Sequence, residues 1–309
     1  MKSMIKNRWK NIIVYIMLLA MLIVPLIINK YMVMVLDLGL LVAIVVLGMV
    51  VLVGFTGQLS LGQVAYYAIG SYAAGILCTR FPISPWIGIL FAGFVGMLFG
   101  ILVGIPAFNL NGPFLAIITI GFFEIVKILL INLQDLTGGP FGLMGIPSLK
   151  IGPIDFSQPL PFFYLVMFIM ILVIVSVIRV RKSRIGRAMI SVMNDEVASP
   201  MLGVNVRKVK LVSFGFSAFL AGLAGGLYAV FTGYIVPDAY TFSESALYLS
   251  MSVVSGFNAI LASVVAVFLN MLPEALRALK EYYLLFFSIA LLIFVMLSAW
   301  KQYKSNNEN

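Results

Sequence analysis

Histidine is missing from this chain of 309 residues, and cysteine occurs once, at Cys78. Without histidine, the chain has neither imidazole ligands for zinc nor His-based acid–base chemistry. A single cysteine excludes a disulfide framework within the chain. Charged residues are also scarce, at 10%, whereas soluble domains carry about 25%. Hydrophobic residues make up 62% and the mean hydropathy is +1.12, which predicts an all-α polytopic membrane protein.

The basic residues give a net charge of +9, but they are clustered. Seven of the twenty lie between Arg181 and Lys210, and Lys2 opens a second group in the first ten residues. This clustering follows the positive-inside rule and differs from the basic groove of a nucleic-acid-binding protein. Residues 11–29 follow the basic start and are long enough to span a bilayer. Because no A-x-A cleavage site follows them, we expect an uncleaved first helix.

Apolar runs of about twenty residues predict membrane spans. They occupy residues 11–29, 31–53, 64–79, 86–105, 113–131, 161–180, 211–231 and 283–300. Residues 245–272 form either one helix or two short segments broken near residues 255–258. Placing both termini inside requires an odd number of crossings after residue 244, which favours about ten segments, including broken or short helices. The prediction is one transmembrane domain, 1–309, with an external loop at 132–160 and a cytoplasmic loop at 181–210.

Two spans carry glycines at four-residue intervals. Gly96, Gly100 and Gly104 follow one face of the span at 86–105, and Gly222 and Gly226 repeat the spacing at 211–231. Such spacing lets helix backbones approach closely in lipid. We expect these glycines to serve packing within the chain more than a dimer interface.

The segment GFTGQLSLGQ at 54–63 interrupts two apolar runs with glycines and hydroxyl-bearing residues. Irregular backbone at membrane depth is tolerated where it is buried in protein or lines a watered cavity, and broken helices mark the binding sites of many transporters. Residues 255–258 form a second, weaker break. One hypothesis is that the polar side chains of both breaks face a translocation route; the alternative is that they only bond one another at a helix contact. These side chains are Thr56, Gln58, Ser60, Gln63 and Asn258.

Three charged residues lie inside predicted spans. Glu124 and Lys127 are three residues apart and so share a helical face, which predicts a structural ion pair in preference to a proton relay. Asp37 has no local partner in the sequence.

Catalytic motifs are missing from the chain. Ser60 does not lie in a G-x-S-x-G elbow, and there is no G-x-x-x-x-G-K-[ST] phosphate-binding loop. The chain is therefore predicted not to be an enzyme, to bind no cofactor and no metal, and to depend on a partner if ATP powers it.

The basic stretch from Arg179 to Lys210 is the longest charged segment between apolar runs. Asn194 is a candidate N-cap with Asp195 and Glu196 in the first helical turn, and Ser199 before a proline is a second. The stretch is therefore either a surface handle of two short helices that another protein moves, or a solvated connector that fixes topology.

A series of motifs resembles the permeases of ATP-binding-cassette importers for branched-chain amino acids. In chain order they are GFTGQLSLGQ (54–63), AIGSYAA (68–74), FEIVK (123–127), TGGPFGLMGIP (137–147), SRIGRA (183–188), NDEVA (194–198), LGVN (202–205) and AGLAGGLYA (221–229). The chain is most similar to the M-type of the two paired permeases.

The resemblance implies a multi-pass protein of a bacterial or archaeal plasma membrane with both termini cytoplasmic. Its implied partners are a second homologous permease subunit, two cytoplasmic ATPases that bind ATP and Mg, and an external solute-binding protein. It also implies that the cytoplasmic loop docks in a groove of the ATPase. The residues implied for this coupling are Arg184, Gly186, Arg187, Asp195, Glu196 and Gly203.

The chain departs from the family pattern on the predicted route. Residues 254–258 replace a glycine-rich G-G-x-G-S element, Val50 replaces an asparagine, and Gln63 replaces a histidine. Leucine, isoleucine and valine are the leading cargo, and urea, short amides, other amino acids or nucleosides are alternatives. A different class, an ion-coupled secondary transporter or channel, would rely on Asp37, Glu124 and Lys127 and need no ATPase.

Overall fold

The computed structural model describes residues 25–81, 83–106, 110 and 112–275. Within these residues, five helices are long and apolar enough to cross a membrane. They are α2 (Lys30–Thr56), α4 (Pro85–Gly104), α5 (Pro113–Asn132), α7 (Pro159–Lys182) and α9 (Val206–Thr232). This confirms the all-α membrane class and places a helix on each of the corresponding predicted spans. The predicted spans at 11–29 and 283–300 lie outside the described residues, so the total of about ten stays a prediction.

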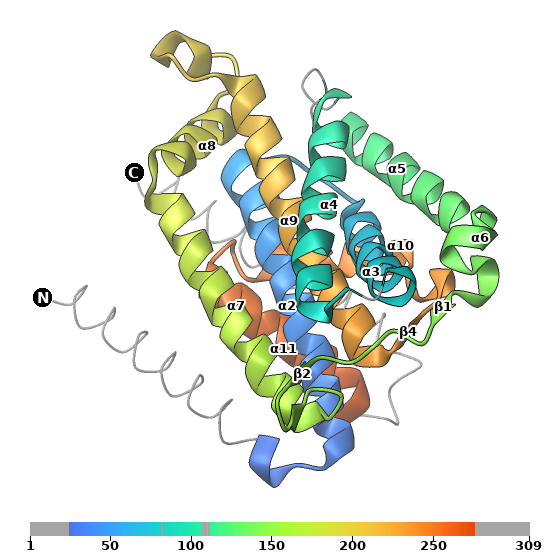
Figure 1. The fold of residues 1–309 in the computed structure, drawn as a ribbon. Coiled ribbons are helices and arrows are strands. Elements are labelled where there is room, and N and C mark those ends of the chain that lie inside the picture. Colours follow the sequence, from blue (N-terminus) through green and yellow to red (C-terminus); the bar gives the residue numbers. More distant parts are fainter. Residues whose placement is uncertain (1–24, 82, 107–109, 111, 276–309) are drawn as a thin grey trace, which may run out of the picture.

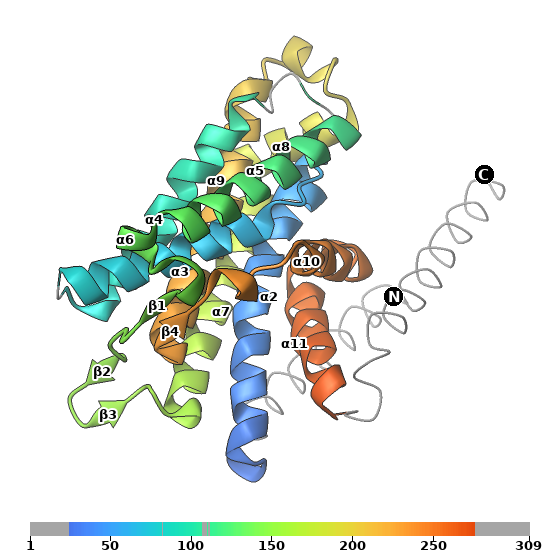
Figure 2. The ribbon, with the colours of Figure 1, turned by 90° about the vertical axis from the view of Figure 1, so that its right-hand side faces the viewer.

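Helix α2 is the central element of the fold. It is apolar on every side, and most of its 27 residues are buried, as expected for a helix surrounded by others. Its neighbours are α3 (Gln63–Arg80), α7, α9, α10 (Phe242–Val254) and α11 (Ala259–Ala275). Figure 2 shows α2 in the middle of the fold with α10 and α11 on one side of it. The centre of the fold is therefore one helix.

The regularly spaced glycines join α4 to α9. A Cβ atom on Gly96 would lie 2.6 Å from the Ala218 carbonyl oxygen, and one on Gly222 would lie 2.5 Å from the Ala92 carbonyl oxygen. Both distances are shorter than any real side-chain contact, so only glycine permits this backbone approach. The expected use of these glycines for packing within the chain is confirmed.

The two long loops lie at opposite ends of α7 (Figure 1). One end carries α6 (Gln134–Thr137), the 3₁₀ helices η2 (Gly139–Phe141) and η4 (Pro237–Ala239), and two small antiparallel pairs of strands. In the first pair β1 (Leu143–Met144) lies against β4 (Tyr234–Ile235), with Leu143 opposite Ile235; in the second β2 (Lys150–Ile151) lies against β3 (Ile154–Asp155). The other end carries α8 (Arg184–Asn194) and the 3₁₀ helix η3 (Ser199–Leu202). The predicted external and cytoplasmic loops are thus on opposite sides.

The apolar region at 245–272 is two helices. α10 ends at Val254, and α11 begins at Ala259 after a turn in which Gly256 and Phe257 both have positive φ, 59° and 56°. A Cβ atom on Gly54 would lie 2.5 Å from the Phe257 Cβ atom, so the turn is wedged against the end of α2. At about 1.5 Å per residue, the 13 residues of α10 are too short to cross a bilayer. The broken-helix alternative is therefore confirmed.

Candidate functional site

The break between α2 and α3, residues 57–62, comes from a glycine that ends α2. Gly57 has a φ of +70°, and the Gly57 and Gln58 amides donate to the carbonyls of Val53 and Leu52. This left-handed glycine is the usual way to stop a helix and turn the chain. The chain then crosses to Gln63, where α3 begins. The predicted interruption near membrane depth is therefore present.

Side chains from three other helices hold the break in place. The Leu61 amide donates to Thr119 Oγ1 of α5 at 2.9 Å, and the Val64 amide donates to Ser245 Oγ of α10 at 3.1 Å. The Gln63 side-chain nitrogen donates to Ser217 of α9, at 2.9 Å to the hydroxyl and 3.1 Å to the carbonyl. The break is thus a joint at which α5, α9 and α10 meet.

Helix α9 contributes a second contact to the end of α2. Thr56 Oγ1 lies 3.4 Å from Ser213 Oγ, one helical turn before Ser217. Sequence reasoning did not single out Thr119, Ser213, Ser217 or Ser245. The only signal available was the four-residue spacing of Ser213 and Ser217, which places both on one face of a helix.

The predicted route residues have different surroundings. Thr56, Ser60 and Gln63 are buried, and each makes a hydrogen bond within the protein. Gln58 is 4% exposed, and neither polar atom of its side chain has a hydrogen-bond partner among the residues that the structure describes. In this conformation Thr56 and Gln63 join helices and Ser60 bonds locally to the Gly62 amide, while both polar atoms of Gln58 and the side-chain oxygen of Gln63 are without a partner among the described residues.

Asn258 does not join this group. It is exposed, and its side-chain oxygen accepts from the Ile260 and Leu261 amides at the start of α11. It lines a separate cavity of about 400 Å³ together with Phe55, Arg181 and Lys182. Asn258 is therefore a cap for α11, because the turn at 255–258 leaves the first amides of that helix without partners.

At the other end of α7, α8 is a short amphipathic helix. The Ser183 hydroxyl accepts from the Gly186 amide at 3.1 Å and so caps its start. A Cβ atom on Gly186 would lie 2.0 Å from the Val180 carbonyl oxygen, which explains the glycine: it lets α8 fold back against the end of α7. Arg184 and Arg187 are exposed. The prediction that Asn194 begins a helix is wrong, since α8 ends there and Ser183 is the cap that the sequence analysis missed.

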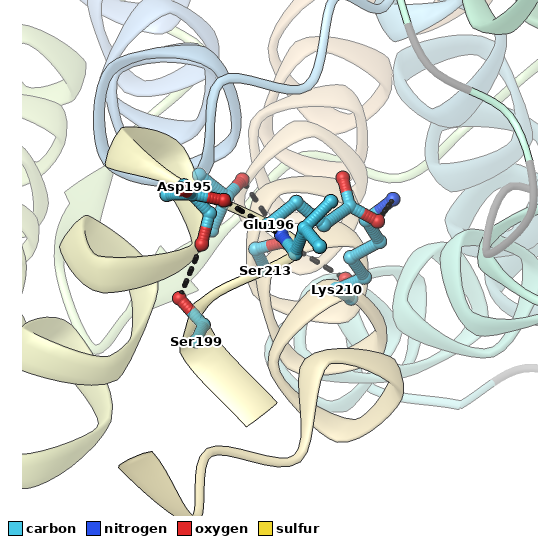
Figure 3. Close-up of polar contacts among 7 residues, drawn as sticks. Asp195, Glu196, Ser199, Lys210 and Ser213 are labelled. Atoms are coloured by element: carbon cyan, nitrogen blue, oxygen red, sulfur yellow. Dashed lines mark hydrogen bonds and ion pairs between the residues drawn. The ribbon is translucent and has the colours of Figure 1, made fainter. Parts of the chain in front are cut away.

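The two acidic residues of the loop hold its shape (Figure 3). Asp195 Oδ1 accepts from the amides of Val197 and Ala198, both at 2.9 Å, and so stabilises the turn after α8. Glu196 Oε1 lies 2.7 Å from Lys210 Nζ. The Lys210 side chain is 1% exposed, so the charge that it carries is buried at the first turns of α9. These carboxylates therefore stabilise the loop itself.

The loop carries a highly exposed apolar group. Val197, Met201 and Leu202 are 79%, 85% and 77% exposed and lie on and beside η3. Gly203 ends η3 with a φ of +77°, which a residue with a side chain adopts only with strain. Exposed apolar side chains grouped in this way are typical of a surface that contacts another protein or a membrane. Sequence reasoning considered the charges and caps of this loop and did not single out these three residues.

The predicted ion pair of α5 is wrong in its partner. Lys127 Nζ lies 3.6 Å from Asp238 Oδ1 of η4, and Glu124 is exposed on the surface of α5. Sequence spacing identifies neighbours along one helix, but the folded chain brings η4 to the end of α5.

Asp37 is fully buried, and its carboxylate has no hydrogen-bond partner among the described residues. Nowhere in the described ranges do three His, Cys, Asp or Glu residues lie close enough to hold a metal ion.

Comparison with known proteins gives a consistent result. The family model described as branched-chain amino acid transport system / permease component matches residues 31–296. The high-affinity branched-chain amino acid transport system permease proteins LivM of Escherichia coli and Salmonella typhimurium are each 35% identical to this chain over 77% of its length. A probable branched-chain amino acid transport permease protein LivM of Methanocaldococcus jannaschii is 22% identical, over 57% of the chain and 55% of the relative.

The match spans 62% of the length of the two bacterial relatives. No solved structure is significantly similar to this chain. The family model covers all five of the long apolar helices and the loop between α7 and α9. The chain therefore belongs to the family of branched-chain amino acid transport system permease components.

Proposed function

We propose that this chain is a permease subunit of an ATP-binding-cassette importer in a bacterial or archaeal plasma membrane, with both termini cytoplasmic. It passes branched-chain amino acids delivered by an external solute-binding protein, together with a second permease subunit. Two cytoplasmic ATPases supply the energy. The family supports the transport role, and the relatives' descriptions support the cargo.

The observation that carries this proposal is the apolar tip of the loop between α7 and α9. Val197, Met201 and Leu202 are its most exposed large apolar side chains, and η3 lies at the end of the molecule opposite the β1–β4 pair. An ion-coupled transporter or channel has no need of a protein-binding surface there, whereas a subunit moved by a separate ATPase does. Arg184 and Arg187, exposed in the first turn of α8, add positive charge to the same loop.

A chain of contacts leads from this tip to the break at 57–62. The Glu196–Lys210 ion pair joins the loop to α9. Three and seven residues further along, Ser213 contacts Thr56 and Ser217 binds Gln63. When the ATPases close, they displace the loop, α9 moves with it, and the ends of α2 and α3 separate or approach. No chemistry occurs on this chain; its residues transmit force and line the route.

Site-specific crosslinking in the assembled complex tests the docking surface. Met201→Cys places a thiol at the tip, Met144→Cys places one on β1 at the other end, and the native Cys78 is 4% exposed and so protected. We expect a thiol-reactive crosslinker attached to the ATPase to react only with the Met201→Cys variant. We also expect leucine uptake into proteoliposomes to require ATP. Equal capture of both variants would refute the docking. Uptake that does not require ATP but depends on an ion gradient would support the secondary-transporter alternative.

A further inference from the structure

A cavity of about 280 Å³ lies where α2, α3, α9, α10 and α11 meet. Its volume is near the lower end of ordinary small-molecule sites, about 300–1,000 Å³. Four tyrosines from four different parts of the chain line it: Tyr67, Tyr228, Tyr240 and Tyr248. The cavity is separate from the break at 57–62 and from the loop at the ATPase end.

Three of these tyrosines, Tyr67, Tyr228 and Tyr240, form a connected group of rings. The ring centroids of Tyr67 and Tyr228 are 5.6 Å apart, and those of Tyr67 and Tyr240 are 5.9 Å apart. Tyr240 is 2% exposed; its hydroxyl approaches Ser71 but completes no hydrogen bond of normal geometry among the described residues. The faces of aromatic rings attract cations, and the attraction grows when water is excluded.

Glu244 supplies the one carboxyl group of the lining. Its Oε2 accepts from the Thr241 amide at 3.5 Å, within a capping box at the start of α10. This long contact leaves the second carboxylate oxygen available. Asn270 supplies an amide, and Leu38 and Val42 of α2 supply apolar surface. A capping role accounts for the carboxylate but not for an open volume surrounded by four tyrosines.

We propose that this cavity binds a zwitterionic amino acid during its passage. Glu244 and the tyrosine rings hold the α-ammonium group, Asn270 and tyrosine hydroxyls meet the carboxylate, and the apolar wall of α2 receives the aliphatic side chain. This inference rests on the proposed transport function and refines it. It assigns the cargo to amino acids with a free ammonium group, in preference to urea, amides or nucleosides.

Binding of radiolabelled leucine to the complex in nanodiscs, without the solute-binding protein, tests this site. The competitors are leucinamide, which keeps the ammonium group, and N-acetyl-leucine, which lacks it. Glu244→Gln keeps a neutral capping group. We expect it to lower leucine affinity about tenfold or more and to remove the preference for leucinamide, because a carboxylate and its cation are no longer paired in a desolvated site.

Two further variants separate binding from folding. Tyr228→Leu removes a ring and should weaken binding, whereas Tyr228→Phe keeps the ring and should restore it. Asp155→Asn, on the β2–β3 hairpin and outside the lining of the cavity, is the matched control for loss of a carboxylate and should leave affinity unchanged. Unchanged affinity and analogue preference in Glu244→Gln would overturn the site.

The outcomes for the wild-type complex distinguish the two proposals. ATP-dependent uptake of leucine without any leucine binding in the absence of the solute-binding protein would overturn this site and leave the transport proposal standing. A complex that takes up no amino acid under any condition would overturn both.

Discussion

Breaking the Glu196–Lys210 ion pair should uncouple ATP hydrolysis from transport. The pair is the strongest polar link between the loop that carries η3 and the helix α9, with 2.7 Å between Oε1 and Nζ. Glu196→Gln removes one charge and leaves the Lys210 ammonium buried, at 1% exposure, beside a neutral amide. We expect the loop to detach partly from α9, because hydration of the Lys210 ammonium is then more favourable than burial beside a neutral amide.

Removing one partner of a buried ion pair costs about 3–5 kcal/mol. Because the Glu196 side chain is 32% exposed, water can replace part of the lost interaction, and we expect a loss of ~1–3 kcal/mol. Lys210→Met alone should cost a similar amount. The double variant should recover most of it, giving a coupling free energy above the ~0.5 kcal/mol within which independent sites add.

The assay is the ratio of ATP hydrolysed to leucine taken up by proteoliposomes, with the unfolding temperature of the detergent-solubilised complex measured in parallel. The ratio should rise in both single variants and return toward the wild-type value in the double variant. Arg207→Met, which removes an exposed charge one turn earlier in α9, is the matched control and should change neither quantity. Additive stability effects with an unchanged ratio would refute the transmission of force through this pair.

Two further substitutions test the break and the helix packing. If the Gln63 amide faces the route, Gln63→Leu should lower uptake about tenfold, the equivalent of ~1.4 kcal/mol. Ser217→Ala removes only the hydroxyl that accepts a hydrogen bond from Gln63 and should not lower uptake. Equal effects of the two variants would show that the contact is merely structural. Gly222→Leu should cost about 3 kcal/mol or more and prevent accumulation of folded protein, because its Cβ would meet the Ala92 carbonyl at 2.5 Å. Gly121→Leu, which has open space around it, should accumulate normally on an immunoblot of membranes, and similar amounts of the two variants would contradict the packing argument.

Much of the fold follows from patterns that are local in the sequence. Apolar runs of sufficient length predict spans, and glycines four residues apart predict close packing, because both depend only on the geometry of a single helix. The break after Thr56 was visible for the same reason, since Gly57 has no side chain to resist a left-handed turn. The family motifs are also short stretches of consecutive residues, so they can be read without the structure.

The site could be predicted only in part. Gln63 was singled out, but its partner Ser217 is 154 positions away in the sequence, and no local pattern connects them. Lys127 was given Glu124 as a partner because helical spacing joins them, whereas the fold supplies Asp238. The acidic residues of the loop were expected to contact an ATPase, but Glu196 is held by Lys210. In each case the partner within the chain is set by proximity in the folded bundle, and the ATPase contact expected for Asp195 and Glu196 stays a prediction.

The sequence by itself determined that this protein is an all-α membrane protein and to which family it belongs, because burial in lipid imposes long apolar helices whatever their neighbours are. The tertiary structure decided what each polar side chain does. It turned Glu196 toward Lys210, left Val197, Met201 and Leu202 exposed, and gathered four tyrosines and Glu244 around one cavity. Helices far apart in the chain must pack before such groups meet, so only the folded bundle contains this information.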